Sequence, residues 1–161
     1  MAEQPAANQE VRKIGITRLY LKDASYEAPN TPAAFTDEWQ PHVNLNLNTQ
    51  SSKQDDGQYE VVLSVTVEVK NKDDNAFLCE VQQAGVFTFD GLSEEEIRHV
   101  AATFCPNQLY PYARAAISDL VVRGGFPGLT LQPINFDALL AQHQQELQQA
   151  QAGAAQTEDR H

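Results

Sequence analysis

Few residues of this 161-residue chain have the types and spacing that catalysis or metal binding needs. The two cysteines, Cys79 and Cys105, lack a CxxC spacing and fit reduced, buried thiols better than a nucleophile or a metal ligand. The four histidines are scattered, and none has a second histidine or a cysteine three or four residues away. No GxSxG nucleophile motif and no phosphate-binding glycine loop with its lysine occurs. The sequence therefore predicts no catalytic residue, no metal site and no cofactor.

A stretch of twenty residues, 23–42, has no clear period and is rich in proline and aromatic residues. Loops of this length inside a compact domain are usually functional. Of its aromatic residues Tyr26, Phe35 and Trp39, the last two either plug the loop onto its own core or line a groove that accepts extended apolar segments of another chain. Both roles are compatible, because a groove wall must itself be anchored.

A second candidate site combines carboxylates with an apolar side chain. Asp23 and Glu27 join Leu78 and Glu80, which lie on the polar side of a predicted strand, opposite Phe77 and its apolar neighbours. Carboxylates around an exposed leucine suit a basic, partly apolar segment of a partner protein. The alternative is a solvated face with one stray leucine.

The elements that must position these residues begin with strands. Alternation of apolar and polar residues predicts four of them, at residues 11–21, 42–49, 60–70 and 76–89. The pattern is clearest in 60–70, where every odd position is Val or Leu, as is typical of a strand with one buried face. The second face of 42–49 is rich in asparagine, and Gly85 is expected to form a bulge. In the first strand Ile14, Ile16 and Tyr20 are expected to share one face.

Downstream, where the apolar spacing changes to 3.6, three helices are predicted, at residues 93–104, from about 107 or 110 to 123, and 135–147. Ser93 begins the first with a capping box to Glu96, and the helix is expected to stop at Cys105-Pro106. Gly124-Gly125 ends the second helix, and Asn135 caps the third. Strands followed by helices predict an α+β fold with an antiparallel sheet.

The composition suits one domain, with 42% hydrophobic residues. Twenty-two acidic residues against eleven basic ones leave a net charge of −11, which opposes binding to nucleic acid or anionic lipid and favours a basic partner. No secretion signal and no membrane span is evident, so we expect a cytoplasmic protein without direct membrane insertion. The polar ends, 1–10 and 148–161, are expected to be flexible and to leave 11–147 as a single domain.

Eight short blocks of the sequence carry a family resemblance. They are KDASYEAPN at 22–30, WQP at 39–41, YEVVL at 59–63, AFLCEVQQ at 76–83, CPN at 105–107, PYAR at 111–114, RGGFP at 123–127 and NFDAL at 135–139. In this order the blocks resemble the bacterial protein-export chaperone family SecB. The chain departs from the family pattern at Tyr26, where Phe is common, at Ala84, where Gly is common, and at Leu140, where an aromatic residue is common.

The resemblance implies a four-stranded antiparallel sheet with helices packed on one face, assembled as a dimer of dimers. It also implies an ATP-independent chaperone, not an enzyme, that binds unfolded preproteins and delivers them to the translocation motor SecA. The resemblance places the site for the basic, zinc-bearing C-terminal tail of SecA at Asp23, Glu27, Leu78 and Glu80. The zinc of such a complex would belong to SecA.

Two further sets of residues are implied by the same resemblance. The groove for unfolded client chains would include Tyr26, Phe35, Trp39 and Phe77. The oligomer interface would involve Cys79, Val81 and Gln83. Two rival functions remain open: an adaptor or dedicated chaperone of the same fold for a single partner such as an antitoxin, and, more remotely, an enzyme that uses a cysteine with a histidine.

Overall fold

The computed structural model describes residues 12–158, so the expected flexible end at 1–10 and the last residues of the expected tail lie outside the described residues. Four strands precede three helices along the chain. The strands are β1 (Lys13–Glu27), β2 (Pro41–Lys53), β3 (Tyr59–Asn71) and β4 (Asp74–Asp90). The helices are α1 (Glu94–Ala102), α2 (Phe104–Arg123) and α3 (Phe136–Glu158), and a short 3-10 helix, η1 (Ala33–Phe35), lies between β1 and β2.

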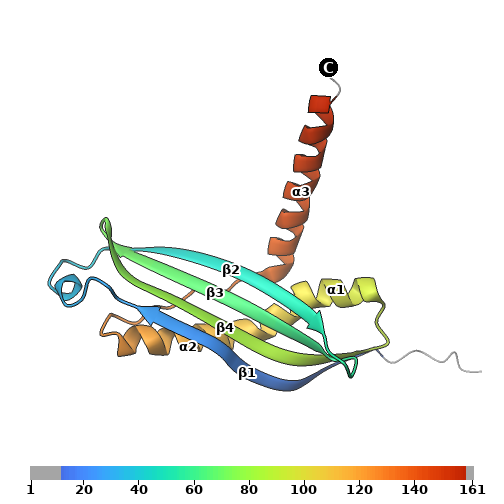
Figure 1. Ribbon diagram of the computed structural model, residues 1–161, viewed down its shortest axis with the longest axis horizontal. Helices are drawn as coiled ribbons and strands as arrows, with labels where there is room; N and C mark the ends of the chain where they lie inside the picture. The colour runs from blue at the N-terminus through green and yellow to red at the C-terminus, as the bar shows by residue number, and fades with distance from the viewer. Residues whose placement is uncertain (1–11, 159–161) are drawn as a thin grey trace, which may run out of the picture.

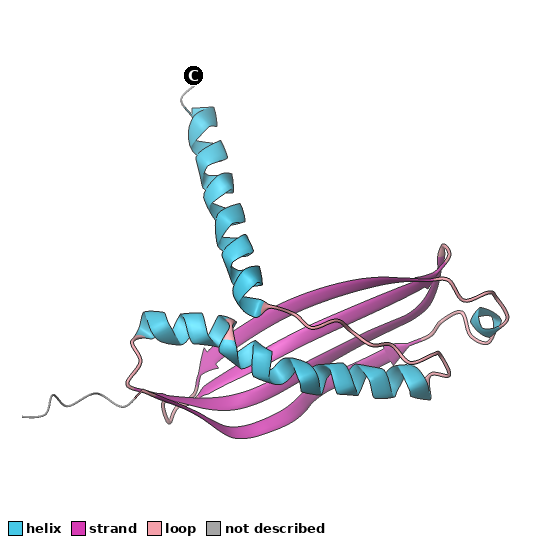
Figure 2. Cartoon of the chain, turned by 180° about the vertical axis from the view of Figure 1, so that it is seen from behind, coloured by secondary structure: helices cyan, strands magenta, loops and turns pink. Residues whose placement is uncertain are grey.

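The strands form one antiparallel sheet in the order β1-β4-β3-β2. Hairpins join β2 to β3 and β3 to β4, whereas β1 lies beside β4 and reaches β2 through the loop 28–40 (Figure 1). Helices α1 and α2 lie across one face of the sheet, which we call the helix face (Figure 2). The opposite face, which no described helix covers, is called the open face. The predicted α+β fold with a four-stranded antiparallel sheet is confirmed.

The alternation in β3 has the predicted consequence. Its odd residues, Val61 to Val69, are buried on the helix face, where each contributes about 1.5 kcal/mol or more by leaving water. Its even residues are half-buried and lie on the open face. Because paired residues of neighbouring strands share a face, the register carries this division to the other three strands.

The sequence prediction for β1 was wrong about its faces. The register of β1 against β4 shifts twice, between Ile16 and Arg18 and between Leu21 and Asp23, so that Thr17 and Lys22 are extra residues. Ile14 and Ile16 pair with helix-face residues of β4, but Tyr20 pairs with Ala84 on the open face. Each bulge reverses the alternation, and the second one turns Asp23 toward the open face.

Strand β4 runs from Asp74 to Asp90 without a register shift at Gly85, so the predicted bulge there is absent. Gly85 serves close packing instead. A Cβ at this position would lie 2.8 Å from a ring carbon of Phe87 and 3.2 Å from Leu109 of α2. Both side chains are fully buried, so the glycine lets α2 approach the sheet.

The first helix begins as predicted, because the Ser93 side chain accepts a hydrogen bond from the backbone N–H of Glu96 at 3.2 Å. The predicted stop at Cys105-Pro106 is wrong: α1 ends at Ala102, and α2 already starts at Phe104. Pro106 is tolerated because it lies in the first turn of α2, where its missing N–H would have no partner within the helix.

Helix α3 is longer than predicted. Asn135 caps it, accepting a hydrogen bond from the N–H of Ala138 at 3.1 Å, and Phe136 packs edge-on against Tyr110. Beyond these first turns the helix stands away from the sheet and continues to Glu158 (Figures 1 and 2). Residues 148–158, expected to begin a flexible tail, are therefore helical, and the flexibility of this segment stays a prediction.

Candidate functional site

The acidic candidate site is assembled on the open face. In the register of β1 and β4, Glu27 lies opposite Leu78, Ser25 lies opposite Glu80, and Asp23 lies opposite Gln82, two residues further along β4. Asp23, Glu27, Leu78 and Glu80 therefore lie on one face of two neighbouring strands. Leu78 is 41% exposed, so an apolar side chain is accessible among three carboxylates. The structure brings together the four residues that the sequence grouped.

Strand β3 adds a carboxylate that the sequence analysis missed. Glu68 lies opposite Leu78 on the side away from Glu27, so that two glutamates flank the leucine. Its carboxylate lies 3.7 Å from the ammonium group of Lys70. Glu80 is held from the same strand, because its Oε2 accepts a hydrogen bond from the Thr66 hydroxyl at 3.1 Å. Alternation in 60–70 assigned Glu68 to the polar face, but only the register shows its neighbour.

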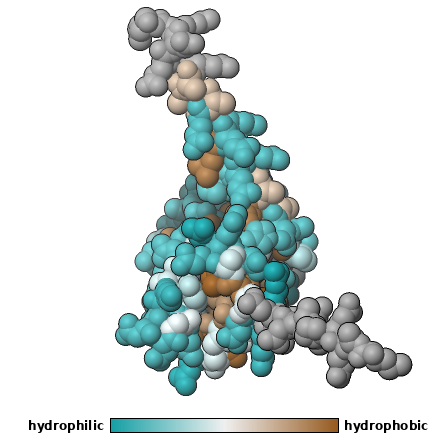
Figure 3. All heavy atoms as spheres, turned by 90° about the vertical axis from the view of Figure 1, so that its right-hand side faces the viewer, coloured by the Kyte–Doolittle hydropathy of each residue, from teal (hydrophilic) through white to brown (hydrophobic). Residues whose placement is uncertain are grey.

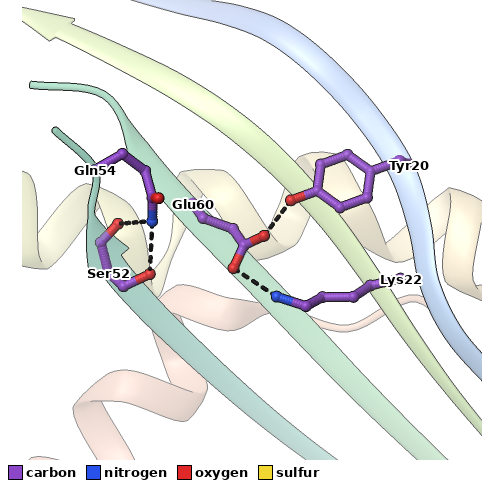
Figure 4. A network of polar contacts seen from close by, with 5 residues as sticks. All are labelled: Tyr20, Lys22, Ser52, Gln54 and Glu60. Carbon is purple, nitrogen blue, oxygen red and sulfur yellow. Dashed lines mark hydrogen bonds and ion pairs between the residues drawn. The ribbon is translucent and has the colours of Figure 1, made fainter. Parts of the chain in front are cut away.

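A polar network crosses the open face next to this site (Figure 4). The Tyr20 hydroxyl and the Lys22 ammonium, both from β1, donate hydrogen bonds to the two carboxylate oxygens of Glu60 on β3, the second over 2.8 Å. The hydrogen bond from Lys22, followed by that from Tyr20, lowers the pKa of Glu60. Burial, aided by the carboxylate, raises the pKa of Tyr20 to about 12. The network ties down Lys22, the bulge residue that precedes Asp23.

The aromatic loop is anchored on the helix face at one end of α2. Three rings surround Phe126, which follows that helix: Phe35 at 5.0 Å, Phe77 at 5.1 Å and Trp39 at 5.4 Å between ring centroids. The loop comprises residues 28–40 and is shorter than the expected stretch 23–42, because the first five residues of that stretch belong to β1 and the last two to β2. Phe35 remains 50% exposed and Trp39 is half-buried, so the loop both plugs the core and presents aromatic surface.

The other two expected groove residues differ in depth, since Tyr26 is half-buried like Trp39 and Phe77 is fully buried. The ring of Tyr26 stacks on Phe77 at 5.9 Å, and Phe77 is buried. Phe77 therefore supports the exposed aromatic residues from below instead of reaching the surface itself. The hydroxyl oxygen of Tyr26 is buried and has no hydrogen-bond partner among the described residues, and this burial raises its pKa.

A second apolar surface lies along β2, where the helices do not cover the helix face. Val43 and Leu45 are 41% and 37% exposed, although they pair with buried helix-face residues of β3. An open groove of about 620 Å³ runs between this strand and the beginning of α3. Its lining is mainly apolar and comprises Leu45, Leu47, Ala102, Ile134, Phe136, Leu139 and Leu140, together with polar residues of β2 and His143. The groove exists because α3 turns away from the sheet and leaves β2 uncovered. The direction of a helix is not visible in the sequence, so the groove was not predicted.

The apolar exposure is local. Figure 3, which views the end of the molecule that carries α1, shows apolar patches surrounded by hydrophilic surface, below a mainly hydrophilic α3. At this end a pocket of about 710 Å³ lies between the start of β1 and α1. Ile14, Leu92, Val100 and Phe104 supply its apolar lining, and charged residues of α1 form its rim.

The residues expected at an oligomer interface lie inside the single chain. Cys79, Val81 and Gln83 are buried on the helix face of β4, so an interface could depend on them only through the side chains that cover them. Desolvation raises the pKa of Cys79 to about 11 and that of Cys105 to about 12. Burial therefore favours the protonated thiol over the nucleophilic thiolate at both positions.

Within residues 12–158 no three side chains of the metal-binding types are grouped closely enough to hold an ion. None of the helices described is both long and apolar enough to span a membrane.

Comparisons with known proteins agree with this architecture. A solved structure with a TM-score of 0.64 and 22% identity covers 76% of this chain and 91% of its own: the Mycobacterium tuberculosis Rv1957 SecB-like chaperone in complex with a ChAD peptide from the Rv1956 HigA1 antitoxin. At this identity the likeness shows the fold alone. A protein of unknown function from Streptococcus agalactiae is more distant, with a TM-score of 0.41, 14% identity, and coverage of 76% of this chain and 98% of its own.

The family comparison covers most of the chain. The sequence model of the family described as "Preprotein translocase subunit SecB" matches residues 7–147. Members of this family are chaperones without enzymatic activity, which removes the cysteine-dependent enzyme from the alternatives. The sheet order, the helices on one face and the matched residues lead to one conclusion: the chain belongs to the SecB family.

Proposed function

We propose that this protein holds unfolded preproteins without ATP in the cytoplasm, keeps them competent for translocation and delivers them to the motor SecA. The observation that carries the proposal is the different chemical character of the two faces of one sheet. Apolar surface is accessible on the helix face at Phe35, Val43 and Leu45, and an acidic site around Leu78 lies on the open face.

The client chain would bind on the helix face. The groove along β2 and the aromatic loop offer apolar surface without a deep, closed cavity, which suits many weak contacts with an extended chain. Weak contacts at several places combine through effective concentration, while each segment still exchanges. Such a chaperone would release its client by handover and would need no nucleotide.

The motor would bind on the open face. Carboxylates of Asp23, Glu27 and Glu80 around an exposed Leu78 complement a short basic segment that carries an apolar residue. The net charge of −11 would attract such a segment from a distance. The zinc-bearing C-terminal tail of SecA is the partner that family membership supports.

Assembly as a dimer of dimers would complete the client surface. Strand β1 is an edge of the sheet, fifteen residues long, and within the described chain its only strand partner is β4. The apolar pocket of about 710 Å³ beside it, at α1, is a surface that a second copy could bury. Cys79, Val81 and Gln83 would support this interface from beneath.

The test measures mass in solution by multi-angle light scattering, with and without an unfolded client. Reduced and carboxamidomethylated ribonuclease A serves as the client, and native ribonuclease A is the matched control. We expect a tetramer that binds the unfolded chain alone, and that binds a zinc-loaded peptide of the SecA C-terminal tail whether or not the client is present. A particle that ignores denatured polypeptides would overturn the proposal.

A dedicated chaperone for one partner is the second candidate, and one observation favours it. The SecB-like chaperone that shares this fold was solved with a peptide of an antitoxin. Binding of several unrelated unfolded proteins with similar affinity would support the general chaperone. Binding of one partner only, with no response to the SecA peptide, would support the dedicated one.

A further inference from the structure

Asn71, the last residue of β3, has a polar side chain buried at the edge of the aromatic loop, where it is 5% exposed. Its Nδ2 donates a hydrogen bond to the carbonyl oxygen of Glu38 at 3.0 Å. Its Oδ1 accepts a hydrogen bond from the backbone N–H of Gln40 at 2.7 Å. These two partners flank Trp39, so one amide group holds the backbone on both sides of the tryptophan.

The ring of Trp39 is held from another direction. Its centroid lies 5.4 Å from that of Phe126, which is buried. The next residue but one, Pro41, begins β2 in register with Asn71. The tryptophan therefore has a fixed backbone and a packed ring, and it keeps part of its surface accessible within a loop that otherwise has little regular structure.

We propose that Asn71 is a positioning residue of the client groove, whose buried amide fixes Trp39 in the orientation in which the ring forms a groove wall. The proposal rests on the proposed function, since it assumes that clients contact this loop. A wall fixed before binding saves the cost of ordering the loop when a client arrives. Asn71 itself, being buried, acts through Trp39 and not by contact with the client.

Two substitutions test the hydrogen bonds that the Asn71 side chain donates and accepts. Asn71→Ala removes both hydrogen bonds, whereas the isosteric Asn71→Asp keeps the acceptor, loses the donor and sets a carboxylate against the Glu38 carbonyl oxygen. Asn75→Ala is the matched control. Asn75 is exposed, and its backbone carbonyl, which accepts a hydrogen bond from Asn30, is kept by alanine.

Trp39 is the only tryptophan of the chain, so its fluorescence reports on this position alone. In both Asn71 variants we expect emission shifted to the red and stronger quenching by acrylamide, with the control unchanged. Affinity for reduced, carboxamidomethylated ribonuclease A, which contains no tryptophan, should fall about fivefold to tenfold. Affinity for the zinc-loaded SecA tail peptide, which belongs to the open face, should stay the same. Unchanged emission and quenching, or undiminished client affinity, would overturn the proposal.

A double-mutant cycle excludes a merely structural role. If Asn71 acts through Trp39, Asn71→Ala has no further effect on client affinity in a Trp39→Ala background. An equal loss in both backgrounds would contradict the proposal. Should the Asn71 variants not fold, hydrogen exchange of the backbone amide of Gln40 in the wild type decides the question. A Gln40 amide that is not protected from exchange would mean that its hydrogen bond to Asn71 is absent in solution, and this would overturn the proposal.

The two proposals fail in different ways. If the wild-type protein binds no unfolded ribonuclease, the proposed function fails and the groove role of Asn71 fails with it. The emission of Trp39 in the variants would then still decide whether Asn71 fixes the loop. If the wild type binds and the Asn71 variants bind equally well, only the present inference is overturned.

Discussion

The hydroxyl group of Tyr26 lies directly against Gly124, the first residue after α2, and it is buried there without a hydrogen-bond partner among the described residues. The contact leaves no room for a side chain on the glycine. It joins β1 to the end of α2, next to the aromatic loop. An unsatisfied buried hydroxyl costs free energy, and a glycine here is needed for space, since its φ of −71° suits any residue.

Tyr26→Phe should therefore stabilise the protein by about 1 kcal/mol, because it removes the buried hydroxyl and keeps the ring that stacks on Phe77. The midpoint of urea unfolding measures the change. Tyr112→Phe is the control, since Tyr112 is exposed on α2. A lower midpoint for Tyr26→Phe would show that the hydroxyl has a partner.

Gly124→Ala should destabilise the protein by about 1–3 kcal/mol, because the new methyl group would overlap the end of the Tyr26 side chain. Gly153→Ala provides the contrast, since a Cβ at that position of α3 meets nothing within 4 Å. In a Tyr26→Ala background, Gly124→Ala should cost much less stability than in the wild type, because the side chain that the new methyl group would overlap is gone. Purely additive effects in unfolding experiments would contradict the overlap.

Glu60→Gln should lower stability near neutral pH and have little effect in acid. The hydrogen bonds from Lys22 and Tyr20 hold the pKa of Glu60 below its ordinary value of 4.5. A depressed carboxyl pKa contributes stability above the unfolded pKa, and this contribution is lost as the pH falls through the folded pKa. Urea unfolding of both proteins from neutral to acidic pH measures the difference, which should shrink below pH 4.5. A difference that is constant with pH would assign the effect to packing.

Glu80→Lys should weaken binding of the SecA tail peptide at least tenfold while leaving client binding and the oligomer largely intact. The lysine would place a positive charge beside Leu78, on the face opposite the client groove. Asp55→Lys is a matched control, because it makes the same change of charge at an exposed position in the turn between β2 and β3. Calorimetry and light scattering measure the three properties. Loss of all three together would show that Glu80 is structural.

Salt should weaken binding of the SecA tail peptide more than binding of unfolded ribonuclease. The open-face site depends on the exposed carboxylates of Asp23 and Glu27 and on the half-buried one of Glu80, whose attraction for a basic peptide is screened by ions. The helix-face surface is mainly apolar and is screened less. Titrations of both ligands at several salt concentrations measure the two slopes. Equal slopes would argue against the division of labour between the faces.

Much of the fold could be predicted from local patterns. In β3 each side chain follows a period of two, and the Ser93 and Asn135 caps depend on residues three positions away, so short-range spacing was sufficient. In β1 the bulge at Thr17 shifts the helix-face residues from Ile14 and Ile16 to Leu19 and Leu21. That change of phase is visible in the sequence, but without the register it cannot be told from a strand with apolar residues on both faces.

In the candidate sites, too, some features follow from local spacing and others from contacts between distant parts of the chain. The grouping around Leu78 was expected, but Glu68 was missed because its place beside the leucine follows from pairing between strands. The hydrogen bonds of Asn71 join residues 31 and 33 positions apart, and no local spacing signals them. The groove along β2 depends on the direction that α3 takes from Asn135, which is also a long-range property.

The opposite orientation of consecutive residues in β4 has a last consequence. Phe77 supports the aromatic surface on one side of the sheet, and Leu78 is exposed on the other. With a single layer of backbone between them, a cargo chain and a motor tail bound as proposed would not compete for space. A ternary complex could then form whichever ligand binds first, and the motor could bind a chaperone that already holds a client.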